Sequence, residues 1–146
     1  MKNINFRIRN QWDDSVANIA VKKSWKDYNL DCLKHLVELE DINFNEINNN
    51  GDSLLMWTLK NDKLDRMSVL LEWPKLDLNA KDRDGNTAAH WAMKNNKMEA
   101  LKILLARPGL DTGIVDNQNN SLIKIARYVN ENTHERMNIS DVIVNQ

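Results

Sequence analysis

The sequence has one cysteine, Cys32, among 146 residues, so no disulfide can form within a single chain. A chain of this length can bury an adequate core without a crosslink. Because lone cysteines are typical of reducing compartments, we expect a cytoplasmic protein. No run of roughly 18 apolar residues could cross a membrane, and the start, MKNINFRIRNQW, lacks the apolar stretch of a signal peptide.

An excess of either charge is also missing. Lys and Arg number 20 and Asp and Glu number 21, and the formal net charge of -1 gives no overall attraction to nucleic acid or to an anionic membrane. The chain has four glycines, and neither G-x-x-x-x-G-K-[ST] nor G-x-G-x-x-G occurs. We therefore expect no nucleic acid, no membrane and no nucleotide cofactor among the ligands.

Residues for metal binding or catalysis are few. Cys32 and His35 share a helical face, but a structural zinc site needs four ligands and no second such pair exists, so we predict a buried thiol and an exposed imidazole. The segment KDRDGN resembles part of a calcium loop, yet Ala80 and Trp91 would occupy its first and twelfth positions, which require acidic ligands. His90 has no nucleophile or acid at a telling spacing. We expect no metal, no cofactor and no enzymatic activity.

The sequence does contain a repeat. Residues 51–84 read GDSLLMWTLKNDKLDRMSVLLEWPKLDLNAKDRD and residues 85–118 read GNTAAHWAMKNNKMEALKILLARPGLDTGIVDNQ, with 11 of 34 positions identical. Both prolines of the chain, Pro74 and Pro108, lie one period apart. The period predicts four units, at about 15–50, 51–84, 85–118 and 119–146, preceded by an N-terminal arm, 1–14, that is extended or disordered.

Each unit has the signals of two helices. Ser53 and Thr87 are good N-caps, because a hydroxyl can accept a hydrogen bond from a free amide at a helix start. Gly51 and Gly85 follow Asn50 and Asp84, and such dipeptides favour tight hairpins between units. Asn-Asp and Asn-Asn pairs at 61–62 and 95–96 tolerate a left-handed turn between the helices. The second helices carry apolar residues at helical spacing: Leu64, Met67, Leu70 and Leu71, then Met98, Leu101, Leu104 and Leu105.

A two-helix unit with one apolar face cannot bury that face alone, so the units must stack into an all-α solenoid. The pattern resembles the ankyrin repeat, with its D-x-x-G-x-T-P-L-H-x-A core and paired leucines. The residues that carry the resemblance are Asp82, Gly85, Thr87, His90, Ala92, Glu99, Leu104, Leu105 and Asp111. Ala88 and Ala89 depart from the family's proline and leucine. The resemblance implies helix-turn-helix units joined by β-hairpin loops, and a structural His90 bonded to Thr87.

The first and last units match less well, as capping units do. One period back, Val21 and Trp25 fit the inner face of a first helix, a turn falls at residues 28–29, and no hairpin glycine precedes. One period forward, Asn119 stands at the glycine site and Ser121 at the cap, but the register fails after Val129. We therefore predict two clear repeats between two degenerate ones.

Two tryptophans recur at one position. In the first helix of residues 51–84, Trp57 lies opposite the core-facing residues, and Trp91 has the same place in the next unit. Both are candidates for partner contact, because exposed aromatics are frequent binding hot spots. Packing against a neighbouring helix or hairpin is an equally supported interpretation. Trp73 precedes Pro74 on the opposite side, and we predict a structural plug beneath the loop.

In ankyrin proteins the inner helices and hairpin tips form a concave surface that binds other proteins. The resemblance implies that this chain is a non-enzymatic adaptor or scaffold, a monomer whose partner is another protein. The positions that match the family's contact sites are Asn49, Asn50, Asp52, Lys60, Asn61, Arg83, Asp84, Asn86, Lys94, Asn95, Asn117, Gln118, Asn120 and Tyr128. Two alternatives stay open: a targeting or stacking segment of a larger protein whose activity lies on another domain, and a bacterial effector.

Overall fold

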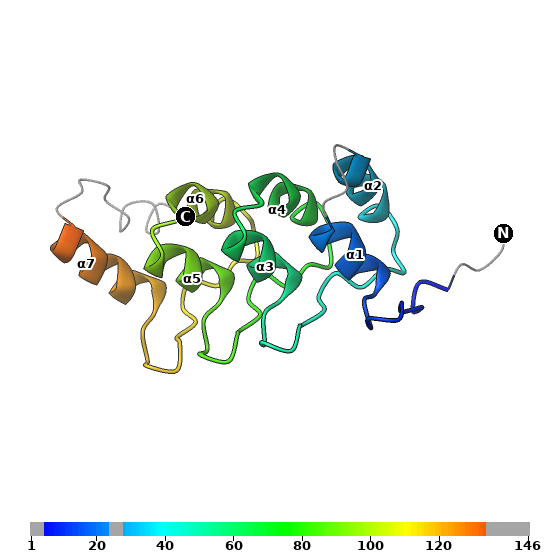
Figure 1. Cartoon of the computed structure of the whole chain (residues 1–146). Helices are drawn as coiled ribbons and strands as arrows, with labels where there is room; N and C mark the ends of the chain where they lie inside the picture. Colours follow the sequence, from blue (N-terminus) through cyan, green and yellow to red (C-terminus); the bar gives the residue numbers. More distant parts are fainter. Residues whose placement is uncertain (1–4, 24–27, 134–146) are drawn as a thin grey trace.

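The structure, a computed structural model, describes residues 5–23 and 28–133, with the backbone alone at 28–29 and 128–133. The described residues form seven helices, α1 (Val16–Lys22), α2 (Tyr28–Leu36), α3 (Leu54–Lys60), α4 (Leu64–Leu70), α5 (Ala88–Lys94), α6 (Met98–Leu105) and α7 (Leu122–Thr133). The inner helices α1, α3, α5 and α7 form one row, and the outer helices α2, α4 and α6 form a second (Figure 1). This arrangement confirms the predicted all-α solenoid of stacked units.

The inner helices begin where the sequence predicts. The hydroxyl of Ser53 accepts a hydrogen bond from the amide of Met56 at 3.2 Å, and Thr87 caps α5 through the amide of His90 at 3.4 Å. The turns that follow α3 and α5 place Asp62 at φ 54° and Asn96 at φ 56°. Asp and Asn adopt such left-handed conformations more readily than most residues, which explains the turns predicted there.

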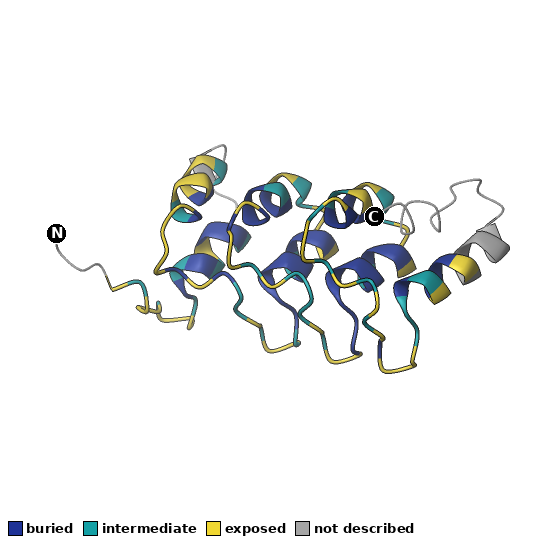
Figure 2. Cartoon of the chain, turned by 180° about the vertical axis from the view of Figure 1, so that it is seen from behind, coloured by how far each residue is buried: buried dark blue, intermediate teal, exposed yellow. Residues whose placement is uncertain are grey.

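The core lies between the two rows of helices. Met67, Leu70, Leu101 and Leu104 of the outer helices are each no more than 1% exposed. Fully burying one such side chain contributes roughly 1.5–3 kcal/mol to folding. Figure 2 shows the buried residues concentrated in the facing sides of both rows, while the hairpin tips are exposed. Stacking of the units is therefore the main source of stability in this chain.

Hairpin loops precede all four inner helices: hairpin 1 (9–15), hairpin 2 (47–53), hairpin 3 (81–87) and hairpin 4 (115–121). The second residue of each loop is Asn10, Asn48, Asp82 or Asp116, and its side-chain oxygen accepts two backbone amides at 2.9–3.0 Å. The fifth residue has a positive φ and is Asp13, Gly51, Gly85 or Asn119. One loop geometry is thus built four times from different residues.

The first unit departs from the prediction. Its positive-φ residue lies 38 residues before that of hairpin 2, whereas the later intervals are 34 and 34. Two of the four extra residues lie between α1 and α2, and the other two make α2 longer than α4. The predicted turn at 28–29 is wrong because α2 begins at Tyr28. Val21 is fully buried as predicted, and Trp25 lies outside the described residues. Residues 9–15 form hairpin 1 within the stretch expected to be an arm.

Two side chains join the first unit to the second. The Arg66 guanidinium of α4 is 8% exposed and donates to the carbonyl oxygen of Val21 at 2.7 Å. The Trp73 ring is 6% exposed and meets Phe44 edge to face, with ring centroids 5.3 Å apart. The predicted plug is therefore confirmed. By contrast, the prediction of a buried Cys32 is wrong: the thiol is exposed, because Leu33 occupies the core-facing position of α2.

Candidate binding surface

The inner helices share a row of apolar residues, which we call the inner-helix row: Ile19, Trp57, Trp91 and Ile125, at equivalent positions of α1, α3, α5 and α7. Trp57 and Trp91 are half-buried. Trp57 packs against the core of the first two units, and Trp91 packs against the core of units two to four. Packing is therefore one role of both rings, and the rest of each ring faces solvent.

A lysine follows each tryptophan by three residues, and it braces a hairpin. The Lys60 ammonium lies 2.6 Å from the carboxylate of Asp52 and 5.9 Å from the centre of the Trp91 ring. The Lys94 ammonium donates to Asn86 and to Asp116, both at 2.7 Å. These lysines are exposed, but their ammonium groups already have partners in the loops. They fix the hairpins relative to the helix ends.

Asp116 is the most buried carboxylate of this surface, with a side chain 0% exposed. Burial alone would raise the pKa of its carboxyl group. The hydrogen bond from Lys94 and the amides of Asn120 and Gln118 more than offset that effect, and the pKa lies well below its ordinary value. The carboxylate is thus a charged anchor that ties hairpin 4 to the end of α5.

His90 has the structural role that the sequence predicts. Its ring is fully buried, with Nδ1 2.7 Å from the Thr87 hydroxyl and Nε2 3.1 Å from the carbonyl oxygen of Asn120. Because a carbonyl oxygen can only accept, Nε2 carries the proton and Nδ1 accepts from Thr87. Burial lowers the pKa of the ring, which favours this neutral form. The histidine links hairpin 3, α5 and hairpin 4.

The tips of hairpins 2, 3 and 4 are bonded to one another. The Arg83 guanidinium donates to the carbonyl oxygen of Asn49, and the Asn117 side chain donates to the carbonyl oxygen of Arg83 at 2.9 Å. The backbone amide of Asn117 also donates to Asp84 at 3.1 Å. Gly51 and Gly85 lie at these contacts with φ of 81° and 75°, so glycine is required at both positions. The three tips form one continuous edge.

The structure places the predicted contact residues in three groups. Asp52 and Asn86 are buried and serve as braces for the lysines. Trp57, Trp91 and Asn120 are half-buried, and the side chain of Tyr128 lies outside the described residues. The exposed group is Asn49, Asn50, Lys60, Asn61, Arg83, Asp84, Lys94, Asn95, Asn117 and Gln118.

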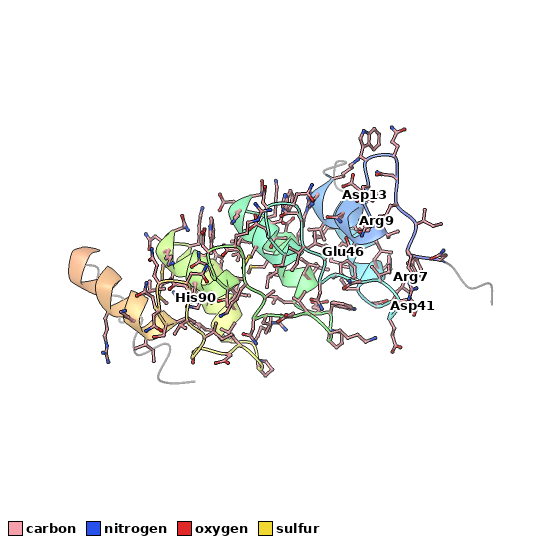
Figure 3. All side chains as sticks on the ribbon, turned by 90° about the horizontal axis from the view of Figure 1, so that it is seen from below. Arg7, Arg9, Asp13, Asp41, Glu46 and His90 are labelled. Carbon is pink, nitrogen blue, oxygen red and sulfur yellow. The ribbon has the colours of Figure 1, made fainter. Side chains whose placement is uncertain are left out.

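Sequence reasoning missed the contribution of the first unit. Trp12 at the tip of hairpin 1 is 67% exposed and Ile47 of hairpin 2 is 59% exposed. The carboxylate of Glu46 lies between them in the chain and accepts from the Arg9 guanidinium at 3.2 Å; both residues are labelled toward the N-terminal end in Figure 3. The pattern N-x-x-D-D-S at 10–15, compared with N-x-x-G-D-S at 48–53, would have identified this hairpin.

Among residues 5–23 and 28–133, no helix is long and apolar enough to cross a membrane. Within the same described ranges, no three His, Cys, Asp or Glu side chains come together in a group that could hold a metal ion. The groups that do converge on this surface are hydrogen-bond donors and acceptors with two half-exposed indoles. Such a surface can bind a ligand by shape, hydrogen bonding and charge.

The capped inner helices, outer helices and stacked hairpins define a repeat solenoid with one extended face formed by helices and loops. This chain belongs to the ankyrin repeat family: the family described as "Ankyrin repeats (3 copies)" matches residues 17–132. The resemblance drawn from the sequence is thereby confirmed. Ankyrin repeats are generally protein–protein interaction modules. A search of curated proteins returns no match.

Several solved structures share the fold. An ankyrin repeat domain from Acinetobacter baumannii AYE has a TM-score of 0.72 at 18% identity, over 99% of this chain and 70% of that one. The ankyrin repeat domain of Bcl-3, a member of the IkappaB family, has a TM-score of 0.70 at 19% identity, over 98% of this chain and 56% of that one. An ankyrin repeat protein from Leishmania major has a TM-score of 0.64 at 17% identity, over 82% of this chain and 42% of that one. At these identities the likeness concerns the fold alone.

Proposed function

We propose that this protein is a non-enzymatic adaptor that holds another protein against its inner helices and hairpin tips. The observation that carries the proposal is the pair of half-exposed indoles, Trp57 and Trp91, at equivalent positions of neighbouring inner helices. Their inner edges are fixed in the core, so binding a partner costs little side-chain entropy. Rigid aromatic side chains of this kind are common binding hot spots.

The polar residues around the indoles determine how a partner is aligned on the surface. Arg83 and Asn117 are held by their bonds to neighbouring tips, and Lys60 and Lys94 are held by Asp52 and Asp116. A partner would therefore meet donors and charges whose positions are already set. The proposed contact set consists of the exposed group above with Trp57, Trp91 and Asn120, and Tyr128 completes it on the side of α7.

The test is capture of partners from a lysate of the source organism, identified by mass spectrometry. Because both indoles also pack, Trp57→Leu with Trp91→Leu is the informative variant: leucine keeps apolar contact and removes the exposed ring. We expect the specific partners to be lost while helical content is kept. Trp73→Leu is the matched control, since it removes a buried indole away from this surface and should leave capture intact.

Two readouts keep the outcome clear. Circular dichroism and the urea midpoint report whether each variant is folded, and capture is compared only between folded variants. If the double leucine variant is folded and retains the same partners, the inner-helix row is not the binding surface. If the double leucine variant unfolds while Trp73→Leu does not, the main role of Trp57 and Trp91 is packing in the core.

We also propose a cytoplasmic location. Cys32 is exposed and is the only cysteine of the chain, so an oxidising compartment would favour disulfides between copies. Addition of an oxidant should accordingly give a covalent dimer on a non-reducing gel, and Cys32→Ser should abolish it.

A further inference from the structure

A groove of about 290 Å³ lies between hairpin 1 and hairpin 2. It is lined by Trp12, Lys22, Ile47 and Asn49 among others. In the part of the chain that the structure describes, no hydrogen bond joins the tip of hairpin 1 to that of hairpin 2. The tips of the later hairpins are joined by the hydrogen bonds of Arg83 and Asn117.

The groove has an apolar rim. Trp12 on one side and Ile47 on the other are among the most exposed apolar side chains of the molecule, at 67% and 59%. The Lys23 ammonium lies over the Trp12 ring at 4.7 Å from its centre, which fixes one face of the indole. Ile19 of the inner-helix row, 36% exposed, lies on the same helix as Lys22, so the groove continues the proposed binding surface.

The charges around the groove are paired with one exception. The Arg9 guanidinium lies 3.2 Å from Glu46 and 3.7 Å from Asp13, and the Lys23 ammonium lies 3.7 Å from Asp14. The side chain of Lys22 makes no hydrogen bond or ion pair with any described residue. Lys22 is therefore the one cation of the groove without a direct partner among the described residues. The three carboxylates that line the groove, Asp13, Asp14 and Glu46, are engaged by Arg9 and Lys23.

Comparison of the repeats shows why the Lys22 ammonium does not bond a hairpin carboxylate. It occupies the position of Lys60 and Lys94, each of which bonds a hairpin carboxylate. The carboxylate that matches Asp52 is Asp14, which lies beside Lys23 instead. The residue of the next hairpin that matches Asp116 is Asn48, a neutral amide. Neither of the two acceptors used elsewhere is therefore open to Lys22.

We propose that this groove binds an acidic segment of the partner protein, with a carboxylate on the Lys22 ammonium and an adjacent large apolar side chain against Trp12 and Ile47. The inference rests on the proposed function and names the chemistry of the partner at one end of the surface. A free cation beside two exposed apolar side chains is complementary to a carboxylate that neighbours a hydrophobic residue.

The probe is a phage-displayed library of random 12-residue peptides, selected on the full chain. We expect enriched peptides to carry Asp or Glu next to Leu, Phe or Trp. One enriched peptide is then synthesised together with its Asp→Asn or Glu→Gln counterpart, and both affinities are measured by calorimetry. Loss of the peptide's carboxylate should weaken binding by roughly tenfold or more.

Lys22→Gln should cause a similar loss, and Trp12→Ala should do the same. Lys102→Gln is the matched control, because both lysines lie in the last turn of their helices, α1 and α6, and α6 belongs to the outer row of helices, away from the hairpin tips (Figure 1). In nuclear magnetic resonance spectra, the peptide should shift the indole N–H signal of Trp12, which Trp12→Phe assigns by its disappearance.

Three results would overturn the proposal: no peptide enriched above background, enriched peptides without an acid, or equal affinity of Lys22→Gln and Lys102→Gln. The proposed function fails separately. If the double leucine variant of Trp57 and Trp91 captures partners normally while Lys22→Gln weakens the acidic peptide, the groove stands and the indole row does not. If the reverse is found, the adaptor function stands and the groove has another role.

Discussion

Hairpin 1 and hairpins 2 to 4 share one backbone geometry but differ in how they meet their neighbours. The later hairpins are bonded tip to tip through Arg83 and Asn117. Hairpin 1 ends in an exposed Trp12, and it meets the second unit through the ion pair of Arg9 with Glu46. All four loops share the side-chain acceptor at the second residue and the positive φ at the fifth, so the hairpin forms without tip-to-tip bonds. Close stacking of the tips places further requirements on the sequence.

The sequence requirement that stacking of the hairpin tips imposes is clearest at the fifth loop residue. In hairpin 1 this residue is Asp13, which has a positive φ of 63° and an exposed side chain. In hairpins 2 and 3 it is glycine, because the next hairpin lies against it. A Cβ on Gly85 would lie 2.7 Å from the backbone nitrogen of Asn117, whereas one on Gly51 would lie 2.8 Å from the flexible Cγ of Arg83.

The largest effect is therefore expected for Gly85→Ala. A non-glycine residue at positive φ costs about 1–3 kcal/mol, and a clash with backbone adds about 1–3 kcal/mol. We expect the free energy of unfolding in urea to fall by about 2–4 kcal/mol. Gly51→Ala meets the same backbone strain but a side chain that can move, so its loss should be about 1–2 kcal/mol. Equal losses at the two sites would contradict the importance of tip stacking.

The sequence predicts the central units well because their signals are local. Caps, positive-φ residues and helical spacing of leucines each depend on a few neighbouring residues. The first unit departs from the prediction because its interval is 38 residues instead of 34, and because Asp13, not a glycine, has the positive φ at its fifth loop position. The burial of Asp52, the exposure of Cys32 and the pairing of each lysine depend on how the side chains pack in three dimensions, which residue spacing does not reveal.

The second prediction concerns the brace between hairpin 4 and α5. Lys94→Met leaves the fully buried Asp116 without its cation, and removal of one partner from a buried pair is strongly destabilising. Because the lysine itself is 32% exposed and two amides still bond the carboxylate, we expect a loss of about 2 kcal/mol. Lys60→Met leaves Asp52, which is 10% exposed, and should cost about 1 kcal/mol. Chemical denaturation at pH 7 compares the two, and a larger loss for Lys60→Met would contradict this account.

The third prediction uses pH to distinguish unit three from unit two, where Met56 replaces the histidine. Burial lowers the pKa of His90, so below the ordinary value of about 6.5 the unfolded chain binds a proton that the folded chain does not. Stability should therefore fall as the pH drops below about 6.5, until the folded pKa is passed. Asp116 affects stability in a separate, more acidic pH range. Because the pKa of its carboxyl group is lowered in the folded chain, the stability that it contributes is lost only below about pH 4.

His90→Met is the matched variant, since methionine is accepted at this position of α3 with 1% exposure. At pH 8 it should be less stable than the wild type by about 1–2 kcal/mol, because the bonds to Thr87 and Asn120 are lost. The difference should narrow between pH 6.5 and pH 5 as the wild type loses stability. Urea midpoints measured across this range provide the test. A constant difference would assign the pH dependence to other groups.

The smallest effect is expected when hairpin 1 is made more like its neighbours. Asp13→Gly removes the strain of a side chain at positive φ, and it also removes a long ion pair with Arg9 in which the carboxylate is 86% exposed. An exposed pair of this kind contributes little, and glycine loses more backbone entropy on folding than aspartate. We expect a net gain of about 0.5 kcal/mol in the free energy of unfolding. A loss of stability would show that Asp13 supports the hairpin through more than its backbone conformation.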